Sequence, residues 1–272
     1  MGYRYPIPMR SVTLSLVQMN SRIDLPEGNL AKMREYVSRC DGSDIICFPE
    51  MCLSGYTTKE PGRIAMDPSD PLISEVRSLA AEKDVAIVFG YVERTDEGLT
   101  LRQEIADGSD APKFYRKTHL GSTEAKAFIP GNELPVFDVK GVRVGTQLCI
   151  ESHIQEICST LRSKGAELVL TPFSTGIAGD RRRDVWRSYL PSRASDNGMF
   201  VTACSAVGDN GEGVCFGGGL IAYDPKGNVI DEYYGTDEKV MTITVGGKLP
   251  RDGPETMSNI SYFDRRRPEL YR

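Results

Sequence analysis

The chain has 272 residues and a mass of 30.0 kDa, and 40% of its residues are hydrophobic and 26% charged. This composition is typical of a folded globular protein and excludes the collagen-like, low-complexity and wholly disordered classes. Its 33 lysines and arginines against 38 acidic residues give a net charge of -5, which disfavours nucleic acid as a partner.

Apolar spacing predicts an alternation of strands and helices along the first half of the chain. After an opening strand, Leu30, Met33 and Val37 share one face of a predicted helix. The run from Val85 to Val92 is rich in β-branched residues, which is typical of a buried strand. The expected elements are strands at 11–18, 44–48, 85–92 and 113–118, and helices at 29–40 and 72–82.

The second half continues this alternation. Lys140-Gly141 predicts a hairpin turn, and Gly165 and Gly198 each follow a predicted helix, where a left-handed cap favours glycine. The expected strands are 134–139, 142–150, 168–171, 199–206, 220–223, 228–233 and 240–245, and the helices are 154–164 and 182–196. Because no Ser/Gly-rich linker interrupts them, we expect one α/β domain over residues 1–272, with a C-terminal tail from about residue 246 to 272.

Neither a membrane segment nor a disulfide framework is expected. No apolar stretch approaches the ~18 residues of a membrane span, and the first ten residues lack the apolar centre of a signal peptide. The seven cysteines are odd in number and form no CxxC pair, which also makes a structural zinc site improbable. The sequence therefore predicts a soluble, cytoplasmic protein with no membrane partner and no metal.

Three predicted strands each lead to a reactive or charged side chain. Glu50 follows the strand 44–48, while Lys117 and Cys149 lie near the ends of the strands 113–118 and 142–150. Loops at strand ends present functional groups on a rigid scaffold, and a carboxylate, an ammonium and a thiol suit covalent acyl transfer. A thiol with a pKa of about 8.5 is mostly protonated at neutral pH. We expect Glu50 to take its proton and Lys117 to stabilise the thiolate and the oxyanion.

The segments around these residues resemble the three signatures of the nitrilase superfamily of carbon-nitrogen hydrolases. They are Phe48 to Tyr56, Tyr115 to Leu120 and Leu148 to Glu151, in the family's order and spacing. Three motifs in register are more specific than any one of them, and the resemblance extends from about residue 11 to about residue 245. Glu124, with Phe128 and Gly131 after it, resembles the family's second glutamate motif.

The resemblance implies a four-layer α-β-β-α sandwich and an enzyme that hydrolyses a small amide to a carboxylic acid and ammonia through a thioester. By this resemblance Cys149 is the nucleophile, Glu50 the general base and Lys117 the oxyanion donor, helped by the backbone N–H of Ile150. Glu124 orients Lys117 or the substrate nitrogen. No metal or organic cofactor is implied.

The resemblance also suggests pocket residues and an assembly. By motif position, Tyr56, Phe173 and Ser174 are expected to line the pocket. Family members commonly pair through the helices that correspond here to 154–164 and 182–196. We therefore expect at least a homodimer, with the C-terminal tail as a candidate part of the subunit interface.

The sequence leaves alternatives open for the substrate and for the activity. The few residues after Val245 favour amides over nitriles, and only six residues separate Lys117 from Glu124, where N-carbamoyl hydrolases carry a longer insert. A nitrilase or an N-carbamoyl amidohydrolase with the same triad is an alternative, as is a non-catalytic member that serves as an interaction module. Arg181, which follows the loop 172–179, is a candidate to bind a substrate carboxylate, whereas His153 is interpreted as a surface residue.

Overall fold

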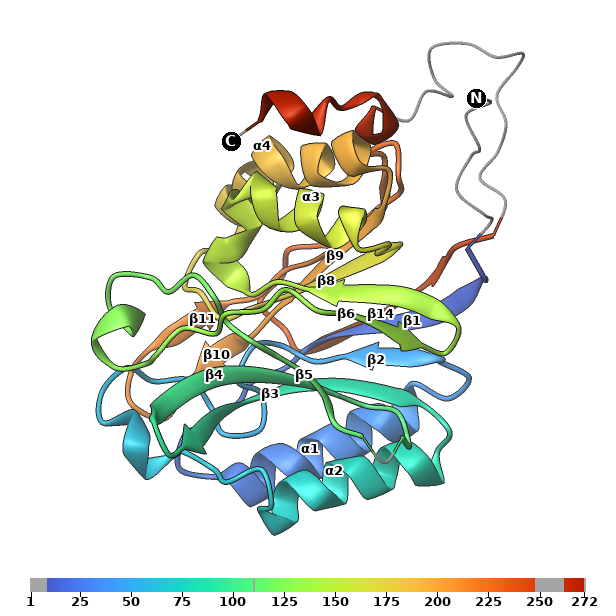
Figure 1. The fold of residues 1–272 in the computed structure, drawn as a ribbon. Helices are drawn as coiled ribbons and strands as arrows, with labels where there is room; N and C mark the ends of the chain where they lie inside the picture. The colour runs from blue at the N-terminus through green and yellow to red at the C-terminus, as the bar shows by residue number, and fades with distance from the viewer. Residues whose placement is uncertain (1–8, 110, 248–261, 272) are drawn as a thin grey trace.

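Two six-stranded sheets stack face to face, and helices cover their outer faces (Figure 1). The computed structural model describes residues 9–109, 111–247 and 262–271. Helices α1 (Pro26–Arg39) and α2 (Pro71–Glu82) cover one sheet, and α3 (Gln155–Ser163) and α4 (Gly179–Asn197) cover the other. The four-layer α-β-β-α sandwich expected from the sequence is confirmed.

The first sheet has the strand order β14-β1-β2-β3-β4-β5, in which β1, β2 and β3 are parallel to one another. Strand β14 returns from the end of the fold to pair antiparallel with β1, so that Val12 lies opposite Val245. The strands are β1 (Val12–Gln18), β2 (Ile45–Cys47), β3 (Ala86–Thr95), β4 (Gly98–Ala106), β5 (Lys113–Arg116) and β14 (Lys239–Val245).

The second sheet has the order β13-β12-β9-β8-β7-β6, with β7, β8 and β9 parallel. Its strands are β6 (Val136–Val139), β7 (Val142–Thr146), β8 (Leu168–Phe173), β9 (Phe200–Ser205), β12 (Leu220–Tyr223) and β13 (Val229–Tyr233). A separate pair, β10 (Val207–Asp209) with β11 (Cys215–Gly217), lies between β9 and β12 in the chain. The short 3-10 helices are η1 (Pro61–Arg63), η2 (Glu124–Lys126), η3 (Cys149–His153), η5 (Phe263–Arg265) and η6 (Pro268–Leu270).

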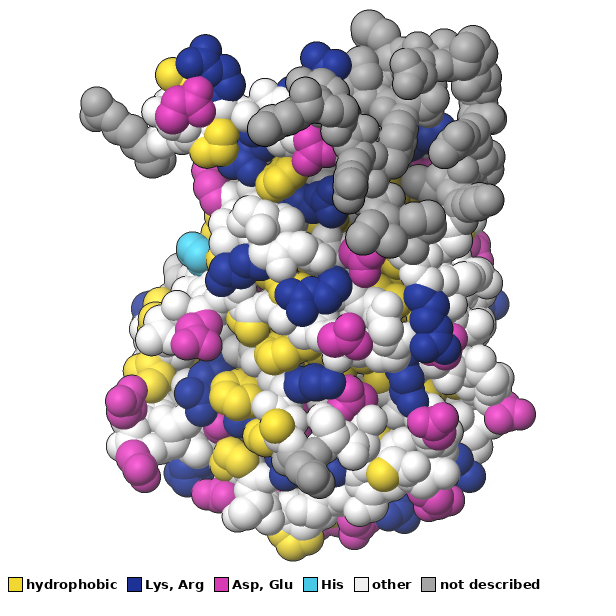
Figure 2. All heavy atoms as spheres, turned by 45° about the vertical axis from the view of Figure 1, so that its right-hand side comes forward, with side chains coloured by type: hydrophobic (Ala, Val, Ile, Leu, Met, Phe, Trp, Pro, Cys, Tyr) yellow, Lys and Arg dark blue, Asp and Glu magenta, His cyan; other side chains and the backbone are white. Residues whose placement is uncertain are grey.

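The central strands are buried on both faces, which explains their nearly continuous apolar runs. In β1, Leu14 and Leu16 join the core between the two sheets, whereas Val17 belongs to the core beneath α1 and α2. Alternate residues thus serve different layers, as the two-residue period of a strand requires. The outer surface carries acidic and basic side chains side by side (Figure 2).

The expected turns and caps agree with the backbone. Lys140 and Gly141 both have positive φ, 53° and 79°, which is the conformation of a tight hairpin turn. Gly165 and Gly198, with φ of 89° and 61°, adopt the left-handed conformation expected after a helix.

Several elements differ from the sequence prediction: strands β10 and β11 were not expected, and α4 begins three residues before its predicted start. Strand β4 was not predicted, because its charged residues obscure the apolar pattern of a buried strand. The expected strand 142–150 ends at Thr146, and Cys149 instead begins η3.

Of the expected tail, residues 248–261 and 272 lie outside the described residues, and 262–271 lies over α3 and α4 (Figure 1). None of the helices in the described ranges is long and apolar enough to cross a membrane.

Candidate active site

The loops that follow β2, β5 and β7 bring three charged groups and a thiol to one place between the sheets. Lys117 lies at the centre, and its Nζ donates to Glu50 Oε1 at 2.8 Å and to Glu124 Oε1 at 2.7 Å. All three of these side chains are buried. Cys149 and Lys117 line the same cavity.

Two backbone turns in the left-handed region shape the site. Cys149 has φ of 49°, and Met51, immediately after Glu50, has φ of 53°. Residues other than glycine rarely adopt this conformation, and such strain is concentrated at functional sites. The turn at Cys149 redirects the chain sharply from the loop after β7 into η3, which places the thiol on the cavity wall.

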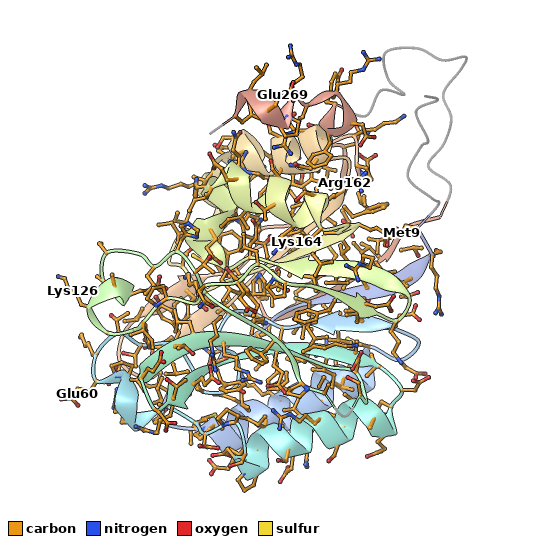
Figure 3. The ribbon with its side chains drawn as sticks, in the orientation of Figure 1. Met9, Glu60, Lys126, Arg162, Lys164 and Glu269 are labelled. Carbon is orange, nitrogen blue, oxygen red and sulfur yellow. The ribbon has the colours of Figure 1, made fainter. Side chains whose placement is uncertain are left out.

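Glu124 is held by donors other than the lysine. The hydroxyl of Tyr56 donates to its Oε1 at 2.8 Å, and the backbone N–H of Gly121 donates to its Oε2 at 2.7 Å. Glu124 begins η2, and Lys126 at the other end of this turn projects outward from the molecule (Figure 3). The short turn therefore directs its glutamate inward and its lysine to solvent.

Burial and charge set the protonation of the site. Burial raises the pKa of Glu50 to about 7, against the opposing effect of the Lys117 ammonium. Burial, together with the Glu50 carboxylate, raises the pKa of Cys149 to about 12, although the ammonium again opposes the shift. Burial acts to lower the pKa of Lys117, but the charges of Glu50, Cys149 and Glu124 raise it overall. At neutral pH the site therefore holds a neutral thiol, an ammonium and a carboxyl group that titrates near neutrality.

One oxygen of Glu50 remains available to accept a proton. Its Oε1 binds Lys117, while its Oε2 is buried and has no hydrogen-bond partner among the described residues. A buried carboxylate oxygen without a partner is uncommon in folded proteins and calls for a functional explanation.

The cavity has a volume of about 300 Å³. The structure places each expected pocket residue on its wall: Tyr56, Ile150, Phe173 and Ser174. Glu50 lies behind Lys117 rather than on the wall, and the Ser174 hydroxyl donates to its backbone oxygen at 2.8 Å. Ile150 is 42% exposed.

The structure does not support Arg181 as the residue that binds a substrate carboxylate in the cavity. Arg181 is exposed and does not line the cavity, whereas Arg182 is buried and lies on the wall. Helix α4 begins at Gly179, and consecutive helical residues point about 100° apart, so only one of the two neighbours faces the site. His153 is exposed at the cavity edge, and its ring packs at a tilt against that of Tyr189, with centroids 4.0 Å apart.

Sequence reasoning did not identify the role of Glu151. This fully buried carboxylate accepts hydrogen bonds from the backbone N–H groups of Leu148, Thr118 and His119 at 2.7, 2.8 and 3.0 Å. The hydroxyls of Tyr115 and Thr118 donate to it as well. Glu151 thus ties the loop that carries Lys117 to the turn that carries Cys149. Its place beside the thiol in the third signature was the only signal for it.

Comparisons with known proteins agree with this geometry. Residues 13–247 match a family model described as carbon-nitrogen hydrolase. An (R)-stereoselective amidase from Pseudomonas sp is 30% identical over 227 residues, which cover 83% of this chain and 81% of that protein. A 2-oxoglutaramate amidase from Bacillus subtilis is 26% identical over 95% of this chain and 99% of its own. The structure of a mutant amidase of the nitrilase superfamily from Nesterenkonia AN1 is similar, with a TM-score of 0.81 and 25% identity, and covers 96% of this chain and 95% of that chain.

Proposed function

This chain belongs to the carbon-nitrogen hydrolase family of the nitrilase superfamily, and from that premise we propose how its residues hydrolyse a small amide. It is a carbon-nitrogen hydrolase that acts on bonds other than peptide bonds. The observation that carries the proposal is the buried bridge of Lys117 to Glu50 and Glu124, behind a cavity that also presents Cys149. The bridge supplies a base and a cation next to the cavity wall that carries the nucleophile.

In the first half-reaction, Cys149 Sγ attacks the carbonyl carbon of the amide and Glu50 Oε2 takes the thiol proton. The thiol pKa of about 12 lies well above the pKa of about 7 of Glu50. A thiolate therefore does not form in advance, and the proton leaves as the carbon-sulfur bond forms.

The negative charge that develops on the carbonyl oxygen of the substrate must be stabilised by hydrogen-bond donors. Two hydrogen-bonding positions of Lys117 Nζ are taken by Glu50 and Glu124, and the third is available, because an ammonium has three donors. Ile150 lies in the first turn of η3, where backbone N–H groups lack partners within the helix. These two groups stabilise the oxyanion.

Collapse of the tetrahedral intermediate breaks the carbon-nitrogen bond. The proton held by Glu50 passes to the leaving nitrogen, which departs as ammonia and leaves an acyl thioester on Cys149. In the second half-reaction Glu50 takes a proton from water, whose oxygen attacks the thioester carbon. The carboxylic acid leaves, and the proton returns to the sulfur.

Glu124 keeps the lysine charged and in place during both half-reactions. It accepts from Tyr56 and Gly121 as well as from Lys117, so its position is fixed from three sides. Its carboxylate, on the cavity wall, also faces the space where the substrate nitrogen lies in this scheme.

The proposal is tested with a pooled panel of amides, N-carbamoyl amino acids and nitriles. We expect ammonia release and an acyl adduct in the intact mass of the wild type, and neither in Cys149→Ala. The mass of the adduct identifies the acyl group. Ammonia release that persists in Cys149→Ala contradicts the thioester route, and release from nitriles alone assigns nitrilase activity instead.

We also propose a cytoplasmic location. All seven cysteines are free thiols, and five of them are buried. Free thiols are typical of a reducing compartment. The location is tested by fractionating cells that express the tagged chain, and recovery in an oxidising compartment contradicts it.

A further inference from the structure

Arg182 is a buried cation on the wall of the cavity that contains Cys149. Its side chain is 1% exposed. Nε donates to the carbonyl oxygen of Ile177 at 3.2 Å, and Nη2 donates to the hydroxyl and, at 3.5 Å, to the carbonyl oxygen of Thr175. Nη1 has no hydrogen-bond partner among the described residues, and the residue lines the cavity.

No carboxylate balances this charge within the described ranges. The other deeply buried arginine, Arg102, lies 2.8 Å from both Glu93 and Glu104, whereas no ion pair joins Arg182 to a described Asp or Glu. A buried charge without a counter-ion is costly, so buried cations are normally paired. A guanidinium without an acidic partner on a cavity wall favours an anionic group in that cavity.

Aromatic packing fixes the guanidinium in place. Its central carbon lies 4.6 Å from the ring centroid of Trp186 and 5.5 Å from that of Phe173. Contacts with ring faces stabilise a cation without neutralising its charge. A guanidinium held in this way is ready to receive a carboxylate with little loss of side-chain freedom.

The rest of the wall suits a short bifunctional molecule. The same wall also contains the apolar side chains of Ile177 and Val185. A volume of about 300 Å³ corresponds to roughly ten water molecules. That space accommodates a short carbon chain with an amide at one end and an anionic group at the other.

We propose that Arg182 binds a carboxylate of the substrate, so that the preferred substrates are short-chain amides that carry a carboxylate at the end distant from the amide. This inference rests on the proposed amide hydrolysis and specifies its substrate class. The alternative is that Arg182 serves only the nucleophile, since its charge also acts to stabilise the Cys149 thiolate. That role would affect charged and neutral amides equally.

Succinamate and butyramide separate these roles, because they differ by a terminal carboxylate in place of a methyl group. We compare their kcat/KM in the wild type, Arg182→Met and Arg182→Lys, with Arg181→Met as the matched control on the exposed side of α4. In Arg182→Met the preference for succinamate over butyramide falls by about 10- to 100-fold, the effect of losing a hydrogen bond to a charged group. Arg182→Lys retains part of the preference, and Arg181→Met retains all of it.

Binding to the inert Cys149→Ala variant gives a second readout that does not need turnover. Calorimetry with succinamate and butyramide is made on this variant alone and combined with Arg182→Met. Selective weakening of succinamate supports the inference even if hydrolysis by Cys149 were disproved. An equal loss for both amides in kcat/KM and in binding, or no preference for succinamate in the wild type, overturns it while leaving amide hydrolysis intact.

Discussion

At the scale of single residues, the proposed mechanism depends on how Glu50 activates the thiol of Cys149. A cysteine nucleophile is commonly activated by a lowered pKa, but burial raises the pKa of this thiol to about 12. The same burial raises the pKa of Glu50 to about 7, which makes it a stronger base than an ordinary carboxylate. In the proposed mechanism, activation of the Cys149 thiol therefore depends on Glu50. The pH dependence of the reaction should then follow the titration of the Glu50 carboxyl group.

We predict that both kcat/KM and the rate of Cys149 alkylation by iodoacetamide rise with pH around a midpoint near 7. Glu50 acts only when deprotonated, so the rates fall as pH decreases through this value. Glu50→Gln should remove the midpoint and slow alkylation by about 10²- to 10⁴-fold, the usual contribution of a general base. Alkylation is followed by intact mass across pH 5 to 10. A wild-type midpoint at the pKa of an ordinary thiol would contradict this mechanism.

The sequence could predict some residues of the candidate site and not others. The sequence could select Glu50, Lys117 and Cys149 as candidates because each follows a short predicted strand and lies in a segment that resembles a family signature. Arg182 was missed, because Arg181 was selected from its place after the loop 172–179 and not from its place on a helix face. The spacing of three and seven residues from Arg182 to Val185 and Tyr189, which line the same cavity, was the signal that could have placed Arg182 on the inward face.

At the scale of elements, Glu151 connects η3 to the loop after β5. Its carboxylate accepts hydrogen bonds from three backbone N–H groups and two hydroxyls. No other described side chain accepts hydrogen bonds from both of these segments. Glu151→Ala leaves these donors buried and unpaired, and each such group costs about 1 to 3 kcal/mol. We predict that the free energy of unfolding falls by about 3 to 5 kcal/mol.

Urea unfolding at fixed protein concentration measures this change. Glu156→Ala is the control, because Glu156 is an exposed acid in the first turn of α3 and should cost about 1 kcal/mol or less. Equal, small effects of the two substitutions would show that Glu151 does not hold the loops together.

Strand β4 shows why local sequence patterns fail to predict a buried strand whose inward side chains are charged. On one face of β4, Arg102 and Glu104 are buried, and they pair with each other and with Glu93 of β3 and Arg77 of α2. Sequence patterns treat charged residues as solvent-facing, because lone charges are rarely buried. The ion-pair partners come from other elements of the fold. The local sequence of β4 therefore does not show that the cost of burying its charges is offset.

We predict that Arg102→Met destabilises the fold by about 3 to 5 kcal/mol, because it leaves the carboxylates of Glu93 and Glu104 less compensated in the interior. Arg94→Met, on the exposed part of β3, should change stability by about 0.5 kcal/mol or less. Denaturant midpoints of the two variants measure the difference. A neutral effect of Arg102→Met would mean that the network contributes no net stability.

At the scale of the whole molecule, the site exists only when the two sheets are packed. Glu50 and Lys117 follow strands of the first sheet, whereas Cys149 and Ser174 follow strands of the second. The hydrogen bond from Ser174 to the Glu50 backbone crosses between them. The antiparallel pairing of β14 with β1 returns the end of the fold to its beginning. Loss of packing between the sheets therefore separates Glu50 from Cys149, the proposed base from the proposed nucleophile.

The C-terminal segment gives the molecule a candidate face for self-association. Residues 262–271 lie over α3 and α4, where the Arg162 guanidinium is 5.6 Å from the Phe263 ring centroid, and Figure 3 shows Arg162 beneath the segment that carries Glu269. Leu270 and Tyr271 are 61% and 55% exposed on it. Exposed apolar side chains that gather on one face indicate an interaction surface. The helices beneath are those through which the sequence predicted pairing.

We predict that sedimentation at micromolar concentration gives at least twice the 30.0 kDa mass of one chain. The double substitution of Leu270→Asp and Tyr271→Asp should shift the particle toward the monomer, because burying two carboxylates without partners opposes association. Leu25→Asp is the control, since Leu25 is 48% exposed but precedes α1 in the opposite helical layer. A wild-type particle of 30.0 kDa would refute the dimer, and an unchanged particle in the double variant would place the contact elsewhere on the molecule.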